Sequence, residues 1–285
     1  MLTQDRYQTI LIEKGASGVA IATLNRPEKL NAVNARMHTE LATLTLDAEA
    51  DPDVKVLLVT GAGRAFCAGG DFSGQGDSPA TGGGQTMREA RQIVDNLLDC
   101  SKPVISAVNG YAMGLGANFA LLADVVMAAR SATFADTHVR MGIGAGDGGQ
   151  VIWPLLMGVN RAKYFLMTGE RLSAEEAERL GLVNFVVEDA ELMPKARAIA
   201  ERLASGPARA IAASKVPINK YLKLVSNLVL PLSLSLEGAT MATADAREAA
   251  HFGDAEFIQA SCGVVGQFTG VRAAGTGEHA RRGGF

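Results

Sequence analysis

The hydrophobic and polar positions of this chain predict strands and helices that alternate through its first half and helices that dominate afterwards. Short apolar runs predict strands, and apolar residues three and four positions apart predict helices. Strands are expected at 9–13, 19–24, 54–60, 104–108, 125–129, 132–134 and 183–187. Helices are expected around 37–48 and at 86–99, 115–123 and 148–157. This alternation is typical of an α/β fold built from β/α units.

The C-terminal part of the chain is predicted to be mostly helical. Ser173-Ala-Glu-Glu176 is a capping-box pattern that opens a short helix, and Gly181 ends it. Further helices are expected at 191–204, 207–223 and 228–250. We therefore expect an α/β core over residues 1–205, a helical region over 206–269, and a flexible tail rich in Gly, Ala and Arg over 270–285.

Composition and charge indicate which classes of protein the sequence does not resemble. The 285 residues are 48% hydrophobic, enough for a sizeable core, and the net charge of −3 gives no support to a nucleic-acid-binding surface. No apolar stretch reaches the ~18 residues needed to span a bilayer, and the N-terminus lacks a signal-peptide pattern. Cys67, Cys100 and Cys262 are too few and too scattered for a disulfide framework or a zinc site. We therefore expect a cytoplasmic protein without metal, membrane contact or nucleic-acid partner.

Two glycine-rich turns each follow a predicted strand. They are Gly63–Asp71, after the strand at 54–60, and Asn109–Gly116, after the strand at 104–108. Glycine lets a ligand approach the backbone closely, so such turns can present bare N–H groups to an anion. If both turns face one pocket, they form an oxyanion hole; otherwise the glycines only permit tight strand-to-helix turns. The Gly- and Ser-rich segment at 73–85 is predicted to be a flexible linker or a mobile flap.

Four stretches of the sequence resemble the crotonase (enoyl-CoA hydratase/isomerase) superfamily. They are Asn25–Ala32, the two glycine-rich turns and Gly169–Val183, and the likeness in order and spacing extends over residues 7–250. The resemblance implies a crotonase-like spiral of repeated β/α units with a helical C-terminal region that mediates trimer formation. It therefore implies a homotrimer or a dimer of trimers, and the apolar segment 224–250 would suit the interface.

The resemblance also implies a set of substrate contacts. The oxyanion-hole amides would belong to Ala68 and to Leu115, where leucine replaces the usual glycine but still supplies a backbone N–H. Coenzyme A would enter as part of an acyl-CoA substrate, with no permanently bound cofactor. Its implied contacts are Lys29 and the backbone of Ala68, Gly69, Gly70 and Asp71.

The acid–base positions depart from the family pattern. Hydratases of the family carry two glutamates, and the matching positions here are Asn118 and His138. Asn118 can orient a water or a substrate, but an amide cannot take up a proton. His138 can act as base and then acid, and Asp147, nine residues on, could fix its tautomer from the other ring nitrogen. The alternatives are a structural His138 and an Asp147 that caps the helix at 148.

Three functions remain open from the sequence. The first is an acyl-CoA hydratase or isomerase in which His138, oriented by Asp147, moves protons or activates water beside an oxyanion-stabilised enolate. The second is retro-Claisen hydrolysis of a β-diketone without coenzyme A, because the His…Asp spacing also resembles that branch of the superfamily. The third is a noncatalytic acyl-CoA-binding member, suggested by the loss of both glutamates. Cys67 is expected to be buried filler rather than a nucleophile.

Overall fold

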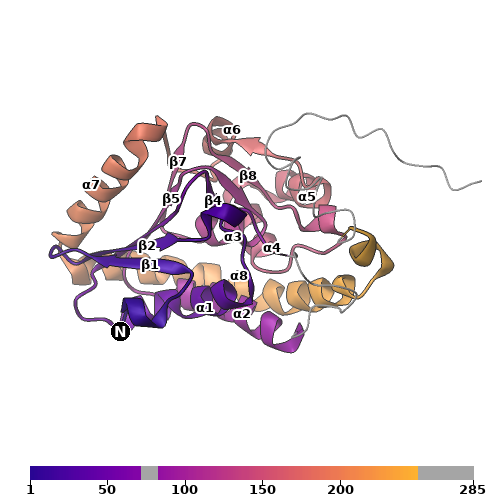
Figure 1. The fold of residues 1–285 in the computed structure, drawn as a ribbon, viewed down its shortest axis with the longest axis horizontal. Coiled ribbons are helices and arrows are strands. Elements are labelled where there is room, and N and C mark those ends of the chain that lie inside the picture. The colour runs from indigo at the N-terminus through magenta and orange to yellow at the C-terminus, as the bar shows by residue number, and fades with distance from the viewer. Residues whose placement is uncertain (72–82, 250–285) are drawn as a thin grey trace, which may run out of the picture.

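The computed structural model describes residues 1–71 and 83–249, which form an α/β fold with two sheets (Figure 1). The larger sheet has six strands in the order β1-β2-β3-β5-β7-β10. Their bounds are Ile10–Lys14, Val19–Leu24, Val56–Gly61, Val104–Val108, Val125–Ala129 and Phe185–Val187. β1 and β2 form the predicted antiparallel hairpin, and every other pairing in this sheet is parallel. β5 is buried along its whole length, as expected for a parallel strand covered on both faces.

A second, four-stranded sheet carries the glycine-rich turns. Its order is β4-β6-β8-β9, with bounds Ala65–Cys67, Tyr111–Met113, Thr133–Ala135 and Leu172–Ser173. The sequence predicted only a strand near β8, because strands of two or three residues are too short to show periodicity. β4 lies inside the first glycine-rich turn and β6 inside the second, so both motifs are partly strand rather than pure loop.

The α-helices α1–α8 cover the sheets and fill the C-terminal half, and a further helical segment follows α8 at 244–249. α1 and α2 pack on each other, and α7 packs against the larger sheet (Figure 1). The capping box predicted at Ser173 is confirmed at the start of α6. The bounds of the first seven are Ala35–Ala50, Gly83–Asp99, Leu115–Leu121, Gly149–Met157, Val159–Thr168, Ala174–Arg179 and Leu192–Ala204.

Helix α8 corrects the sequence prediction. It is one continuous helix, Ala208–Met241, where two helices were expected at 207–223 and 228–250. Pro217 and Pro231 lie inside it. Its inner face is fastened to the domain: Asn219 Nδ2 donates to the Leu98 carbonyl at 2.9 Å, and Lys215 Nζ lies 2.6 Å from Asp124 Oδ2. On the other side of residues 224–227, which no predicted helix covered, Ser233 Oγ donates to Gln150 Oε1. Contacts on both sides of that segment therefore hold the continuous helix against the domain.

The same helix revises the expectation about membrane spans. By length and composition alone α8 is apolar enough to cross a bilayer, although a single such helix is weak grounds for a span. The expectation that no stretch is long and apolar enough to span a bilayer was therefore wrong by length and composition. Lys215 and Asn219 tie this helix to the α/β core, which is how an apolar helix docked on its own protein behaves.

Parts of three sequence predictions lie outside the described residues. The linker or flap predicted at 73–85 falls there except for its last three residues, which begin α2. The end of the helical region at 206–269 and the tail at 270–285 also fall there. The predicted boundary between core and helical region lies in the short connection from α7 to α8.

Candidate active site

The first motif, Asn25–Ala32, acts as a scaffold for the first glycine-rich turn. Asn31 is fully buried, and its amide donates to the carbonyls of Ala62 at 2.9 Å and Ala65 at 2.8 Å. Leu30 and Asn31 both have positive φ, 51° and 57°, which is uncommon for residues other than glycine. That turn aims the Leu30 carbonyl at the Ala68 N–H, 3.0 Å away. The motif therefore fixes the position of the segment that follows β4.

The two glycine-rich turns lie against each other. A β-carbon added to Gly69 would lie 3.1 Å from the Met113 carbonyl oxygen. One added to Gly116 would lie 2.6 Å from Cys67 Cβ, closer than real side-chain contacts allow. Glycine is needed at these positions because the two backbones approach so closely. The structure thus brings together the two motifs that the sequence predicted would meet.

The backbone amides of the turns differ in availability. Ala68 was expected to supply an oxyanion-hole amide, but its N–H already donates to the Leu30 carbonyl at 3.0 Å. The Asp71 N–H donates to the Val33 carbonyl at 2.9 Å. Gly70 N–H has no hydrogen-bond partner among the described residues. Leu115 begins α3, so its N–H lies outside the helical hydrogen-bond ladder.

His138 lies beside the second turn, at the exit of β8. A β-carbon added to Gly114 would lie 3.4 Å from His138 Cε1. Residue His138 is the first of the short 3-10 helix His138–Met141, and 12% of the His138 side chain is exposed. The predicted neighbourhood of imidazole and glycine-rich turn is therefore present.

The His138 ring lies between two carboxylates. Its Nε2 is 3.1 Å from Asp147 Oδ2, so the predicted pairing of His138 with Asp147 is observed. Its Nδ1 is 2.6 Å from Asp136 Oδ1, a residue that the sequence analysis did not select. The carboxylate that fixes the ring from Nδ1 is thus Asp136. Asp147 contacts Nε2, the ring nitrogen that was expected to face a substrate.

Charge pairing shifts the pKa values of the pair in opposite directions. Burial alone would lower the pKa of His138, but the attraction of Asp147 and Asp136 outweighs it and raises that pKa well above 6.5. Burial acts to raise the pKa of Asp147, but His138 and the Asn118 amide lower it below its usual value. Near neutral pH the cluster therefore holds an imidazolium and an ionised Asp147.

The side chain of Asn118, which was expected to orient a water or a substrate, contacts both carboxylates beside His138. Its side chain is fully buried, and Nδ2 donates to Asp136 Oδ2 at 3.0 Å and to Asp147 Oδ1 at 2.6 Å. Its Oδ1 accepts from Trp153 Nε1 at 2.9 Å. The amide groups are engaged within the protein, so Asn118 holds both carboxylates in place. The capping alternative for Asp147 also fails, because Gly148 is the N-cap of α4 and no side chain caps it.

Glu237 on α8 joins the cluster and was missed from the sequence. Its side chain is 4% exposed, and Oε2 has no hydrogen-bond partner in the described structure. Burial, and then repulsion from Asp147, raises the pKa of Glu237 to about 8. Gly146 leaves room for this carboxyl group, because a β-carbon there would collide with Oε2. Sequence periodicity could not have predicted this contact, because it does not show that Glu237 on α8 lies beside the loop before α4.

His38 interacts electrostatically with the cluster, and three other residues selected from the sequence have separate surroundings. His38 pairs with Glu89 (Nδ1–Oε2 2.8 Å) and adds to the electrostatic lowering of the pKa of Asp147. Lys29 is exposed on the 3-10 helix Pro27–Lys29. The Asp71 carboxylate forms an ion pair with Arg26 at 2.8 Å. Cys67 is 1% exposed and burial raises the pKa of its thiol to about 12, which fits the expected filler.

The cluster is organised by ion pairs rather than as a metal centre. Ligand-type atoms of Asp136, His138 and Asp147 lie within 4.8 Å of one another. However, each ring nitrogen of His138 faces a carboxylate oxygen, so neither nitrogen presents a lone pair to a cation. We therefore treat the three side chains as a proton-binding unit.

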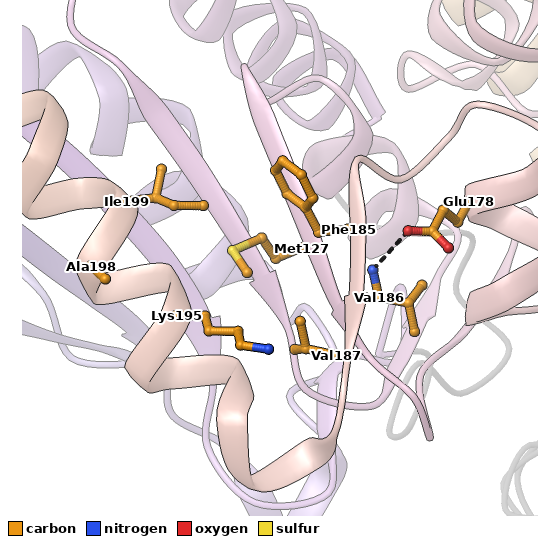
Figure 2. A pocket seen from close by; sticks show the side chains of 8 residues that line it. All are labelled: Met127, Glu178, Phe185, Val186, Val187, Lys195, Ala198 and Ile199. Atoms are coloured by element: carbon orange, nitrogen blue, oxygen red, sulfur yellow. Dashed lines mark hydrogen bonds between the residues drawn. The ribbon is translucent and has the colours of Figure 1, made fainter.

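A cavity elsewhere in the fold lacks this chemistry. It measures about 430 Å³ and lies between α7 and the edge strand β10 (Figure 2). Its walls are mainly apolar, Lys195 is paired with Glu191 at 2.8 Å, and Glu178 accepts from the Val186 N–H. None of the side chains around His138 lines it, so the candidate site remains at the glycine-rich turns.

Relatives of this chain include enzymes that act on coenzyme A esters. A probable enoyl-CoA hydratase from Rhodobacter capsulatus is 38% identical over 85% of this chain and 93% of the relative. A 1,2-epoxyphenylacetyl-CoA isomerase from Escherichia coli is 38% identical over 81% of this chain and 90% of the relative.

Solved structures share the fold. An enoyl-CoA hydratase/isomerase from Mycobacterium paratuberculosis matches with a TM-score of 0.82 and 37% identity, covering 86% of this chain and 99% of the other. A β-diketone hydrolase from the cyanobacterium Anabaena, bound to (S)-3-oxocyclohexyl acetic acid, matches with a TM-score of 0.77 and 33% identity, covering 84% and 96%. The enoyl-CoA hydratase/isomerase family model matches residues 14–256. With its crotonase fold, the chain therefore belongs to the enoyl-CoA hydratase/isomerase family of enzymes.

Proposed function

We propose that this enzyme moves a proton next to the thioester carbonyl of an acyl-CoA and stabilises the resulting enolate with the amides of Gly70 and Leu115. The observation that carries the proposal is the His138–Asp147 pair beside two glycine-rich turns in contact. Gly70 replaces Ala68 in this role because the Ala68 N–H is already used. In other enzymes, loss of one such donor costs about 10²–10³ in rate.

Asp147 and Glu237 are the groups we assign to proton transfer. A lowered pKa keeps Asp147 ionised, so its carboxylate can accept a proton from the carbon next to the thioester. The carboxyl of Glu237 retains its proton near neutral pH and can donate it. His138 supplies the positive charge that balances Asp147. The two carboxyl groups therefore offer a base and an acid in one cluster.

Double-bond isomerisation suits these groups better than hydration. Asn118 stands where the family hydratases carry one of their two glutamates, and its amide is engaged with Asp136 and Asp147. A single acid–base cluster is enough to remove a proton from one carbon and return it to another. Isomerisation of a different coenzyme A ester, 1,2-epoxyphenylacetyl-CoA, is the activity in the name of one 38%-identical relative. We therefore favour an enoyl-CoA isomerase.

Hydrolysis of a β-diketone is the second candidate. Two observations favour it: the His138–Asp147 pairing and the likeness to the Anabaena β-diketone hydrolase structure. In that reaction the cluster would activate water to attack one carbonyl, and the same amides would hold the enolate that leaves.

Assays of three substrates separate these reactions. A 3-enoyl-CoA, crotonyl-CoA and a cyclic β-diketone would be offered to the wild-type enzyme and to the His138→Ala variant. We expect isomerisation of the 3-enoyl-CoA and a strong loss in the variant. Cleavage of the diketone alone would replace the first proposal by the second. Turnover that is unchanged in His138→Ala would show that the acid–base cluster is wrongly assigned.

Substrate binding and assembly complete the proposal. We place the coenzyme A moiety near Lys29 and Gly70, while Ala68 and Asp71 act mainly within the scaffold. We also propose that α8 forms the contact between subunits of a homotrimer or a dimer of trimers, since its outer face exposes a stripe of large apolar side chains. The stripe comprises Ile218, Tyr221, Leu224, Leu228, Leu232 and Leu236, each at least half exposed. Light scattering of the wild type and of Leu228→Lys would test this assembly.

A further inference from the structure

His138 has both ring nitrogens committed in this structure. Nδ1 lies 2.6 Å from Asp136 Oδ1 and Nε2 lies 3.1 Å from Asp147 Oδ2. An ionised carboxylate can only accept a hydrogen bond, so each ring nitrogen must donate one. A ring that donates from both nitrogens is an imidazolium. It has no lone pair left with which to take a proton from a substrate.

Asp136 is held more firmly than Asp147. It is fully buried, its Oδ1 also accepts from the His138 backbone N–H at 3.3 Å, and its Oδ2 accepts from Asn118 at 3.0 Å. The bare α-carbon of Gly149 is packed against Asp136 Oδ2, where any β-carbon would collide. These contacts prevent the Asp136 carboxylate from turning away from the ring. Asp147 keeps 6% of its side chain exposed.

We propose that Asp136 is a positioning residue that orients His138 through Nδ1 and keeps the ring doubly protonated, so that His138 serves as a fixed cation against Asp147. This assignment reverses the roles expected from the sequence, where Asp147 was the orienting group and His138 the base. The kinetic consequence, that Asp147 exchanges the proton with the substrate, rests on the proposed function. The protonation state of the ring does not depend on it.

The surrounding charges favour this state. Asp136 at the exit of β8, Asp147 before α4 and Glu237 on α8 all interact electrostatically with the ring, and no other of the described cations pairs with these three carboxyl groups. The His38–Glu89 pair between α1 and α2 lies further out and acts on Asp147. A neutral His138 would leave two buried carboxylates without a counter-charge, which is strongly unfavourable.

Nitrogen NMR of the wild-type enzyme tests the proposal directly. Protein labelled with ¹⁵N in histidine would be titrated from pH 5 to pH 8.5, and His138→Gln would identify the His138 signals. We expect both His138 nitrogens to stay protonated across neutral pH. A midpoint near 6.5, or an Nδ1 without its proton at pH 7, would overturn the proposal. This measurement needs neither a substrate nor a folded Asp136 variant.

The Asp136→Asn variant then assigns the effect to Asp136. Removing one of the two anions is expected to lower the midpoint of His138 by about 1–3 pH units. Asp47→Asn is the matched control, because Asp47 is another buried carboxylate that accepts from an aromatic side chain, Tyr7 at 2.8 Å, and it does not contribute to the pKa shifts of His138, Asp147 or Glu237. It should leave the His138 signals unchanged. An unchanged midpoint in Asp136→Asn would contradict the assigned role.

Kinetics separate this inference from the proposed function. In Asp136→Asn we expect kcat to fall and its pH profile to shift with the His138 midpoint, with KM nearly unchanged. A loss of kcat with the wild-type profile would mean that Asp136 is only structural, and the inference would fail. If no acyl-CoA is turned over by the wild type but the NMR result is as expected, the proposed reaction fails and the positioning role stands.

Discussion

Two regions of this molecule each bury three carboxyl groups and pair them differently. Near the N-terminus, Glu40 accepts from the Gln8 and Thr9 backbone N–H groups and from the Thr9 hydroxyl. Asp51 accepts from the Leu2 and Asp53 N–H groups and from Lys14. The third, Asp47, accepts from the side chains of Arg6 and Tyr7. Glu40 and Asp51 therefore have backbone donors, and each of the three carboxylates is also paired with a partly exposed cation. They tie the N-terminal segment to α1, which is a structural task.

The three carboxyl groups around His138 have far fewer donors. Asp136 and Asp147 share one imidazole ring and one Asn118 amide, and Glu237 Oε2 has no partner in the described part of the chain. Of these, only Asp136 accepts from a backbone N–H, that of His138. Burying underpaired carboxyls reduces stability, and such groups cluster where a protein needs shifted pKa values. The contrast supports the proposal that the active site lies around His138.

The largest expected effect follows from removing the ionised carboxylate at position 147. Asp147→Asn keeps the shape of the side chain but cannot accept a proton, so we expect the rate on the accepted substrate to fall by about 10²–10⁴. The measurement is kcat at neutral pH, with Asp47→Asn as the matched control that should retain activity. Activity within tenfold of wild type in Asp147→Asn would remove Asp147 from the acid–base step.

The second-largest expected effect is an increase in the free energy of unfolding in the Glu237→Gln variant. The folded pKa of Glu237 is about 8, above its ordinary 4.5, so the folded state keeps a proton that the unfolded state releases. The stability of the wild type should therefore fall by about 1.4 kcal/mol per pH unit between these two values. Glutamine has no such dependence, so the variant should gain on the wild type as pH rises.

Urea unfolding at pH 5, 6.5 and 8 would measure the Glu237 effect. The difference in free energy of unfolding between Glu237→Gln and the wild type should grow across the three values. An equal difference at all three would mean that Glu237 is ionised in the folded protein, and its assignment as proton donor would be lost.

In the N-terminal region, replacing a buried carboxylate by an amide should reduce stability, whereas Glu237→Gln should increase it. Asp51 is fully buried, and its donors lower its pKa below the ordinary 3.8. Asp51→Asn breaks its pairing with Lys14, and we expect a loss of about 3 kcal/mol at pH 7 with activity per folded molecule unchanged. The contribution is present above pH 3.8 and disappears as pH falls through the lower folded pKa, so unfolding at pH 3 should show a smaller difference. A loss of activity would link the two regions.

The central strands of the larger sheet could be predicted from the sequence, because each of them is a distinct apolar run. The apolar runs near 54–60, 104–108 and 125–129 became β3, β5 and β7. Strands β4, β6 and β9 were not predicted, since two or three residues show no period. Helix α8 was predicted as two helices because the local pattern ignores tertiary contacts on both sides of residues 224–227, such as Asn219 with Leu98 and Ser233 with Gln150.

For the site, the sequence located the motifs but not every partner. His138 and Asp147 were expected together and lie 3.1 Å apart. Ala68 as an oxyanion-hole amide stays a prediction, and no sequence pattern reveals that its N–H donates to the Leu30 carbonyl. Asp136 was adjacent and available, and its position two residues before His138 could have suggested it. Glu237 reaches the cluster only through the docking of α8, a long-range contact that periodicity cannot predict.

The smallest expected effect sharpens the comparison between the two regions. Arg36 pairs with Glu40 at 2.6 Å one helical turn away, but 44% of the Arg36 side chain is exposed. Exposed pairs of this kind contribute about 0.3–0.5 kcal/mol, so Arg36→Ala should barely change urea unfolding. Glu40 would keep its backbone donors at Gln8 and Thr9. A loss above about 1.5 kcal/mol would mean that cations, and not backbone amides, hold the N-terminal carboxylates, and the contrast with the His138 cluster would disappear.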